Sequence, residues 1–269
     1  TGTGWLLLVP MLFLVVFLVV PLVFLCLTAF GDGFGTFGDV LGNSFFREAL
    51  VRTFQICLFT TVLTLVVGTV YALGLALAPT WLRIALLASL VLILWSSLLV
   101  RTYGWILVYL PTGILYSVGK RLGLVDQPIS IYQTTTAMYP AMVHVMLPLM
   151  ILPVYASVRR LDVLQIRAAQ VMGARTLMVL RRVVLPQLRP GMVAGATLVF
   201  LTSFGFFITP QLLGGPDDVT IATIINQAFS RFGHVREAAS MSVILVLVVA
   251  VVYLVADRLF KVSEQWGQQ

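Results

Sequence analysis

The most informative shortage in this sequence is a shortage of charge. Of its 269 residues only 10% are Asp, Glu, Lys or Arg, whereas 60% are hydrophobic and the mean hydropathy is +1.04. A soluble domain carries about 25% charged residues, and its core would leave many of these apolar side chains exposed to water. The composition therefore excludes a soluble globular protein and predicts that the lipid bilayer is the solvent for most of the chain.

Cysteines and catalytic motifs are also scarce. The two cysteines, Cys26 and Cys57, both fall within apolar runs, which favours small buried side chains over a disulfide or metal framework. The sequence contains no G-x-x-x-x-G-K-[ST] loop and no H-E-x-x-H pair, so this chain should not bind ATP through a P-loop. We expect no catalytic residue, no metal and no cofactor in this chain, and therefore no enzymatic activity of its own.

Long apolar runs are what the sequence has instead. Because hydrocarbon leaves unpaired backbone groups unsatisfied, each run long enough to cross a bilayer should be helical. The expected fold is an all-α integral membrane protein, a single domain over residues 1–269 with six transmembrane helices. The predicted spans are 5–30, 53–78, 84–103, 132–155, 192–210 and 238–260.

Basic residues gather in one predicted loop, residues 156–190. This loop has a single acid, Asp162, and the arginines Arg159, Arg160, Arg167, Arg175, Arg181, Arg182 and Arg189. Positive charge in short loops marks the cytoplasmic side of a membrane protein, so we expect this loop and both termini to lie in the cytoplasm. The uneven distribution of the net charge of +7 favours contact with membrane lipid and excludes a nucleic-acid partner.

A loop of this length should contain structure of its own. Residues 157–172 have apolar side chains near helical spacing and predict an amphipathic helix, after which Gly173 permits a turn that a Cβ would hinder. Thr176 is placed to cap a second helix over 177–185, which Pro186 should end. The expected helix–turn–helix lies across the membrane face, where it either docks a protein or binds anionic lipid headgroups.

The same loop repeats a known spacing of small residues and prolines, with Ala168-Ala169, Gly173-Ala174, Leu185-Pro186 and Pro190-Gly191. This pattern resembles the cytoplasmic signature of binding-protein-dependent ABC importer permeases, Glu-Ala-Ala-x-x-x-Gly followed further on by Leu-Pro. In that family the first short helix docks in a groove of the ATPase subunit. The resemblance implies ATPase coupling by Arg167, Ala168, Ala169, Gly173, Ala174, Leu185, Pro186, Pro190 and Gly191. Arg167 departs from the family, which usually has Glu there, so a salt bridge at this position would need an acid on the partner.

The resemblance extends beyond the loop. Segments 101–105, 123–128, 142–148 and 210–216 look like the spermidine/putrescine-type permease subfamily. That resemblance implies a type I importer in the bacterial cytoplasmic (inner) membrane, working by alternating access. It also implies a second homologous permease as a heterodimer partner, two ATPase subunits that bind ATP and Mg, and an extracytoplasmic substrate-binding protein. The implied solute is a polyamine or a related amine, opine or aminophosphonate.

Several polar and aromatic residues in the spans are candidates for the substrate pathway: Arg101, Tyr103, Trp105, His144, Ser203, Phe204 and Phe207. Aromatic faces suit a cationic amine, and a histidine is costly enough in lipid to face the bundle. An interfacial belt for the first three residues, and ordinary helix packing for the last three, explain the same pattern. The segment 211–237 either contacts the substrate-binding protein or forms a solvated turn.

One shortage counts against a polycation. No Asp or Glu lies deep in any predicted span, so an anionic contact for the solute would have to come from the second permease. A different class of protein, an ATP-independent secondary transporter or channel, would instead predict ionisable residues or broken helices at mid-membrane.

Overall fold

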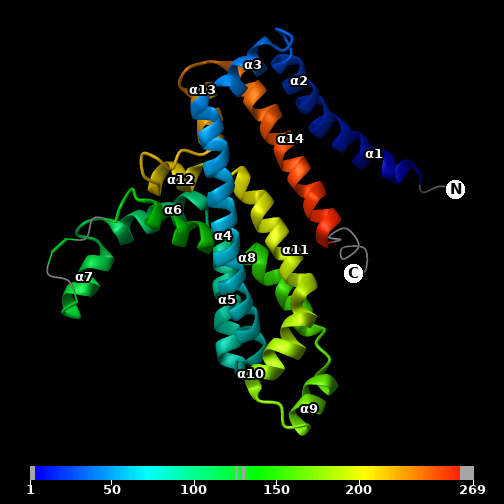
Figure 1. Ribbon diagram of the computed structural model, residues 1–269, viewed down its shortest axis with the longest axis vertical. Helices are drawn as coiled ribbons and strands as arrows, with labels where there is room; N and C mark the ends of the chain where they lie inside the picture. Colours follow the sequence, from blue (N-terminus) through cyan, green and yellow to red (C-terminus); the bar gives the residue numbers. More distant parts are fainter. Residues whose placement is uncertain (1–3, 125–126, 129–130, 261–269) are drawn as a thin grey trace.

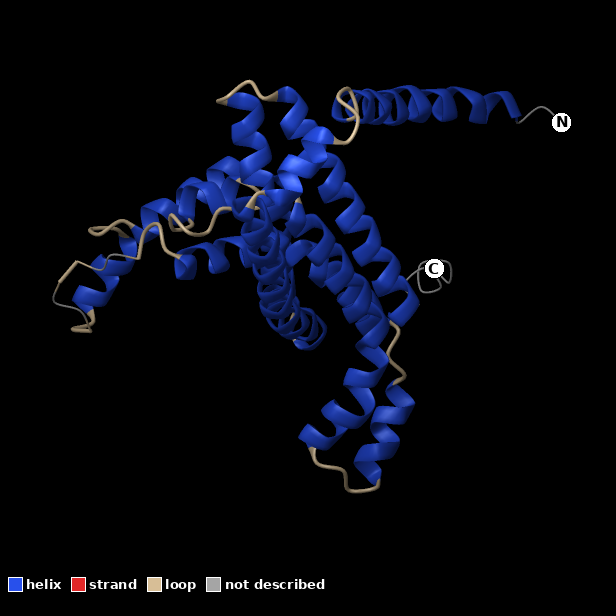
Figure 2. Cartoon of the chain, turned by 45° about the horizontal axis from the view of Figure 1, so that its top comes forward, coloured by secondary structure: helices blue, strands red, loops and turns tan. Residues whose placement is uncertain are grey.

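The computed structural model describes residues 4–124, 127–128 and 131–260, and in this part of the chain it contains helices and no strand (Figures 1 and 2). Two π-helical turns, Val15–Val19 and Leu180–Val184, interrupt otherwise α-helical segments. The α-helices are α1 (Gly4–Leu14), α2 (Val20–Ala29), α3 (Gly35–Gly42), α4 (Ser44–Leu77), α5 (Thr80–Trp95), α6 (Leu98–Tyr109), α7 (Ile114–Arg121), α8 (Thr135–Arg159), α9 (Val163–Val171), α10 (Thr176–Val179), α11 (Leu185–Phe204), α12 (Ile208–Leu213), α13 (Ile221–Ser230) and α14 (Val235–Phe260).

Among the described residues, six helical stretches are long and apolar enough to cross a membrane, which confirms the predicted all-α fold with six spans. They cover Val9–Ala29, Ser44–Leu77, Leu98–Arg121, Thr135–Arg159, Thr176–Phe204 and Val235–Arg258. Four of them, the first, second, fourth and sixth, overlap the predicted runs closely. The third and fifth differ from the prediction in ways that bear on the candidate site.

Helices α4, α8 and α11 pack together at the centre of the molecule (Figure 1). Their shared core contains Leu75 of α4, Met150 of α8 and Leu188 of α11. Glycines bring the backbones close, since a Cβ built on Gly68 would lie 2.5 Å from Met150 Cγ, and one on Gly195 would lie 2.7 Å from its Sδ. Small residues at helix contacts are the usual means of packing in a membrane, where dispersion rather than water drives association.

The first span runs away from this core. Helices α1 and α2 are joined by a π-helical turn into one long rod that diverges from α4, α8 and α11 in both views (Figures 1 and 2). Its C-terminal end packs on α14, where Ala29 is buried and Arg236 Nη1 lies 3.0 Å from Asp32 Oδ1. Cys57 of α4 is buried as predicted, whereas Cys26 of α2 is exposed within the chain, so the prediction was wrong there.

The predicted third span, 84–103, is wrong as a single helix. Helix α5 ends at Trp95 and α6 begins at Leu98, with Ser96 and Ser97 between them in extended conformation (ψ 140° and 141°). Serine side chains compete with the backbone for hydrogen bonds and so favour helix ends, and Ser96 Oγ donates to Ile93 O at 3.2 Å. The apolar stretch of sufficient length begins only after this break.

The predicted architecture of the loop 156–190 is also wrong in part. Helix α8 continues to Arg159, so the helix expected over 157–172 shortens to α9, which Asp162 caps by accepting a hydrogen bond from Leu164 N at 2.9 Å. Thr176 is the first residue of α10 and not its cap.

Pro186 does not end a helix, because helical structure runs without a break from α10 through the π-helical turn into α11. Proline lacks a backbone N–H and disturbs the α-helical hydrogen bonding of the preceding turn, and here the preceding turn, Leu180–Val184, is π-helical rather than α-helical. The predicted fifth span, 192–210, therefore begins much earlier, at Thr176. It ends at Phe204, and Pro210 belongs to the separate helix α12.

Candidate functional site

Helix α9 and the turn after it form the tip of the molecule farthest from α3 and α13 (Figure 1). Large apolar side chains stand exposed there, with Leu164 74%, Val171 89% and Met172 80% accessible. This tip lies outside the six candidate spans. An apolar surface of this kind, in water, is typical of a place where another protein binds.

A tight turn holds the tip in shape. Gly173 has φ +80°, a conformation that L side chains rarely adopt, and its N–H donates to Gln170 O at 2.9 Å. The N–H of Ala174 donates to Ala169 O at 3.0 Å, which completes a glycine C-cap of α9. The glycine therefore sets the angle between α9 and α10, as the sequence predicted.

The two alanines of the signature do not form one flat patch. Ala168 is exposed, whereas Ala169 is only 9% accessible and packs in the core that α4, α8 and α11 share. Arg167 is exposed on α9, and among the described residues it makes no salt bridge. Helix α9 thus has one face held by the bundle and one face open, with a single arginine on the open face.

The rest of the predicted coupling set lies away from the tip. Leu185, Pro186, Pro190 and Gly191 all belong to α11. Gly191 is buried against Pro153 O and Ser157 Oγ of α8, so closely that a Cβ would collide with both. Gly191 therefore packs α11 against α8, whereas Leu185 and Pro186 are half-buried and Pro190 is exposed.

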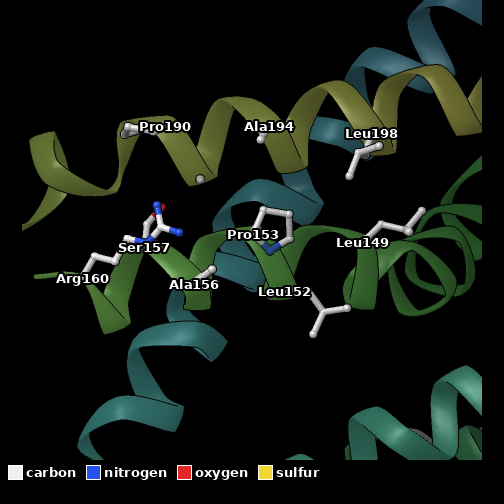
Figure 3. Close-up of a pocket in the computed structure, with 10 residues that line it drawn as sticks. Leu149, Leu152, Pro153, Ala156, Ser157, Arg160, Pro190, Ala194 and Leu198 are labelled. Carbon is white, nitrogen blue, oxygen red and sulfur yellow. The ribbon is translucent and has the colours of Figure 1, made fainter. Parts of the chain in front are cut away.

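A cavity of about 310 Å³ opens beside this contact between α8 and α11 (Figure 3). Pro153, Ser157 and Arg160 line it from α8, and Pro190 and Ala194 line it from α11. The Arg160 side chain extends toward Ser157 at one end, and leucines close the other end (Figure 3). The cavity lies next to the predicted coupling loop, where a change in the α8–α11 contact would alter it.

The candidate pathway residues of α6 meet α8. Trp105 Nε1 donates a hydrogen bond to His144 Nδ1 at 3.2 Å. A nitrogen that accepts a hydrogen bond has no proton of its own, so His144 is a neutral imidazole in this arrangement. Arg101 lies one helical turn before Trp105, on the same face of α6, while Tyr103 is 56% exposed on another face. The structure therefore brings together Arg101, Trp105 and His144 and separates Tyr103 from them.

Two further aromatic rings line the hollow in which the Trp105–His144 pair lies. Phe59 of α4 and Tyr139 of α8 line the same cavity of about 620 Å³ as Trp105 and His144, and the Phe59 and Tyr139 ring centroids are 4.6 Å apart. Neither ring was among the predicted pathway residues, because their contact across two helices leaves no mark in sequence spacing. Such a wall of aromatic faces attracts cationic groups.

The candidates from α11 are placed otherwise. Ser203 is 2% accessible and donates to Val199 O at 2.7 Å, and Phe204 is 1% accessible. The Phe204 ring packs on Phe200, with centroids 5.2 Å apart. Phe207 is half-buried between α11 and α12. Helix packing thus accounts for the burial of Ser203 and Phe204 within this chain, and their place in the substrate pathway stays a prediction.

The segment 211–237 contains the end of α12, an exposed turn at Pro216 and Asp217, and helix α13. Asp218 is only 7% accessible and accepts hydrogen bonds from Gly215 N at 2.7 Å and from Thr135 Oγ1 at 3.0 Å. Thr53 Oγ1 of α4 accepts from Ile221 N of α13 at 3.0 Å. These polar contacts tie α13 and its preceding loop to α4 and α8.

No group of three or more His, Cys, Asp and Glu that would hold a metal ion occurs within the part of the chain that the structure describes.

A hydrogen bond between Thr102 of α6 and Thr209 of α12, 3.4 Å between hydroxyl oxygens, was missed by the sequence reasoning. The two threonines are 107 residues apart along the chain, so sequence spacing gives no sign of their contact.

No family model matches the sequence. The spermidine/putrescine transport system permease protein PotB of Escherichia coli (strain K12) is 32% identical over 211 residues, which cover 78% of this chain and 77% of that protein. The fold is similar to that of a bacterial ABC transporter involved in the import of the acidic polysaccharide alginate, with a TM-score of 0.77 at 17% identity over 95% of this chain and 93% of that chain. A bacterial alginate ABC transporter in complex with an alginate pentasaccharide-bound periplasmic protein gives a TM-score of 0.77 at 18% identity, over 94% and 91% of the two chains. At this identity and coverage, the chain belongs to the family of ABC importer permeases that includes the spermidine/putrescine transport system permease proteins.

Proposed function

We propose that this permease subunit carries a polyamine, or a related amine such as an opine or an aminophosphonate, into the cytoplasm across the bacterial inner membrane. A relative with 32% identity is a spermidine/putrescine permease. The cavity lined by Phe59, Trp105 and Tyr139 supports a cationic solute, since aromatic faces attract ammonium groups. Acids in the candidate spans are confined to the span ends. In this subunit the aromatic rings, rather than carboxylates, would therefore contact the cationic groups of the solute.

The working assembly, in this proposal, contains a second related permease, two ATPase subunits and an extracytoplasmic substrate-binding protein. A solved transporter of the same fold includes a periplasmic protein, which supports the last partner. ATP and Mg would be bound by the ATPase subunits, because this sequence has no P-loop. The basic loop 156–190 and both termini would face the cytoplasm.

The observation that carries the coupling proposal is the exposed apolar tip of α9. Its open face would dock on an ATPase subunit, while Ala169 on its other face packs in the core of the bundle. Closure of the ATPase pair would then move α9 as a rigid body and shift α8 and α11 with it. The bundle would switch between inward-open and outward-open states, which is alternating access through a two-state movement of packed helices.

Docking at the tip is tested by Leu164→Asp, which places a charge on the open face of α9. The matched control is Leu122→Asp, on a leucine that is 67% exposed directly after α7, away from α9 (Figure 1). We expect the tagged wild-type chain, co-expressed with the proteins encoded beside it, to recover an ATPase, and Leu164→Asp to lower that recovery at least tenfold. Recovery of no ATPase by the wild-type chain would support an ATP-independent transporter or channel instead.

The solute is tested by uptake of labelled spermidine and putrescine into cells that contain the complete assembly. Trp105→Leu removes the ring that bonds His144, whereas Trp81→Leu removes a 71% exposed ring of α5. Only the first substitution should reduce uptake, by tenfold or more, with the ATPase still bound. Equal uptake by both variants contradicts a role for the aromatic cavity.

A further inference from the structure

Arg101 of α6 is a guanidinium without a partner in the described part of the chain. Its Nε is buried and makes no hydrogen bond, and neither of the two salt bridges among the described residues involves it. The neighbouring side chains are engaged elsewhere, since Thr102 bonds Thr209 and Trp105 bonds His144. Arginine cannot lose its charge in a protein and offers five N–H donors, so this position calls for an acceptor from outside the chain.

The cost of leaving Arg101 unpaired is high because of where it lies. It belongs to the candidate span Leu98–Arg121, and an ionised side chain within a membrane segment pairs with an opposite charge or a polar backbone group. The side chain is only partly buried, so the end of the guanidinium remains open to another molecule.

Helix α6 also presents an uncovered apolar stripe beside Arg101. Val100 is 66% exposed, Tyr103 56% and Leu107 59%, at spacings that place them on one face of the helix. Gly104 lies in the same stripe, and no atom comes within 4 Å of the position a Cβ would take. A small residue in an apolar stripe permits the close approach of a second membrane helix.

We propose that this face of α6 packs against the second permease subunit and that an acidic side chain of that subunit receives Arg101. The proposal rests on the function proposed above. It adds which helix of this chain meets the second permease and which ion pair joins the two subunits.

The candidate spans of this chain contain few acids of their own, Glu48 in α4 and Glu237 and Asp257 in α14. The proposal commits to a related permease chain, with an acid inside a span, as the partner of Arg101. A second copy of this chain in that place, with one of these three acids as the acceptor, would overturn it.

Charge reversal provides the first test. This chain is tagged, co-expressed with the related permease and the ATPase, and purified in detergent as Arg101→Glu, with Arg47→Glu as the control on an exposed arginine of α4. Arg101→Glu should lower recovery of the second permease at least tenfold, and Arg47→Glu should leave it unchanged. Each acid in the spans of the second permease is then changed to Lys, and one of these changes should restore recovery with Arg101→Glu. Normal recovery by Arg101→Glu, or rescue by none of the acids, overturns the proposal.

Proximity provides a second test that does not depend on how well the charge-reversed chain folds. Leu107→Cys, in a chain with Cys26 and Cys57 replaced by Ser, is treated in membranes with a bismaleimide against a cysteine scan of the second permease. A cross-link to a span that contains an acid is expected, and no cross-link at any position overturns the contact.

Other acceptors for Arg101 give different results. If the Arg101→Met variant still binds the second permease but no longer co-purifies with phosphatidylglycerol, the acceptor of Arg101 is a lipid phosphate. If the variant assembles normally but loses uptake, the acceptor is an anionic group of the solute. Either result overturns the proposal. Loss of the ATPase from the wild-type preparation contradicts the proposed function instead, so the two failures are distinguishable.

Discussion

The rod formed by α1 and α2 and the central helix α8 are both membrane spans, yet they are packed in opposite ways. The most apolar stretch of α1–α2 has no buried residue, whereas half of the corresponding stretch of α8 is buried, although α1–α2 is the more hydrophobic of the two. Helix α8 also contains Pro140, Pro148 and Pro153, which would interrupt most soluble helices. In this protein the hydrophobicity of a span does not predict how much of it is buried within the chain. Burial depends instead on how closely the surfaces of neighbouring helices fit together.

The difference has a physical cause. Lipid tails solvate leucine and valine as well as a protein core does, so apolar side chains alone provide little reason for two helices to associate. Close backbone approach and dispersion contacts must supply it. Helix α8 obtains both through methionines that fit against glycines of its neighbours, as Met150 does with Gly68 and Gly195.

The largest effect should come from emptying the core of α8. Met146 is 1% accessible, and Met146→Ala should lower the free energy of unfolding by about 2–5 kcal/mol, since it leaves a cavity among rigid neighbours. Thermal unfolding of the detergent-solubilised chain, followed by tryptophan fluorescence, measures the change. A loss well under about 1 kcal/mol would mean that α8 is not packed as described.

Overfilling the α8–α11 contact should have the next largest effect. Gly191→Leu drives a side chain into Pro153 and Ser157 and should destabilise the chain by about 1–3 kcal/mol, as overpacked cores do. Gly74→Leu is the matched control, because Gly74 also lies in a helix but has no atom within 4 Å of its Cβ position. If both substitutions destabilise the chain equally, helix propensity rather than packing is responsible.

A substitution at the tip should affect function more than stability. Gly173→Val forces a β-branched residue into φ +80° and should change the angle of α9, so that uptake falls at least tenfold while ATP hydrolysis and membrane insertion persist. Gly173→Asn is the control, since Asn tolerates this conformation. Uptake by reconstituted vesicles, measured beside phosphate release, separates coupling from activity. Normal uptake by the valine variant refutes the role of the turn.

The sequence predicted what the membrane dictates. Run length and the shortage of charge gave the all-α fold and six spans, because a bilayer leaves few alternatives, and Gly173 marked the turn at the tip because few residues accept its backbone angle. The break in the predicted third span at Ser96 and Ser97 was missed, although serine side chains favour such a break. The passage of helical structure through Pro186 was missed because it involves a π-helical turn that local propensity does not predict.

The candidate site was predictable to a similar extent. Trp105 was identified as an aromatic candidate and His144 as a costly residue in a span, and their hydrogen bond appeared only when α6 and α8 were placed together. Ser203 and Phe204 carried the same sequence signal, but they are buried in helix packing. A polar or aromatic residue in a span therefore identifies a candidate, and the fold decides whether its side chain packs within the chain, as Phe204 does, or stays exposed, as Tyr103 does.

The smallest effect should come from the rod, through a substitution of the same kind as in α8. Met11 of α1 is 66% exposed, so Met11→Ala should change the unfolding free energy of the isolated chain by less than about 0.5 kcal/mol, as exposed positions do. The same methyl thioether is lost as in Met146→Ala, so the ratio of the two effects measures burial with the chemistry held constant. Thermal unfolding of both variants in one detergent gives that ratio, and similar losses would show that the rod packs on the bundle. Repeating the pair in the complete assembly extends the comparison, because an effect of Met11→Ala that appears only there assigns the exposed face of the rod to a partner subunit rather than to lipid.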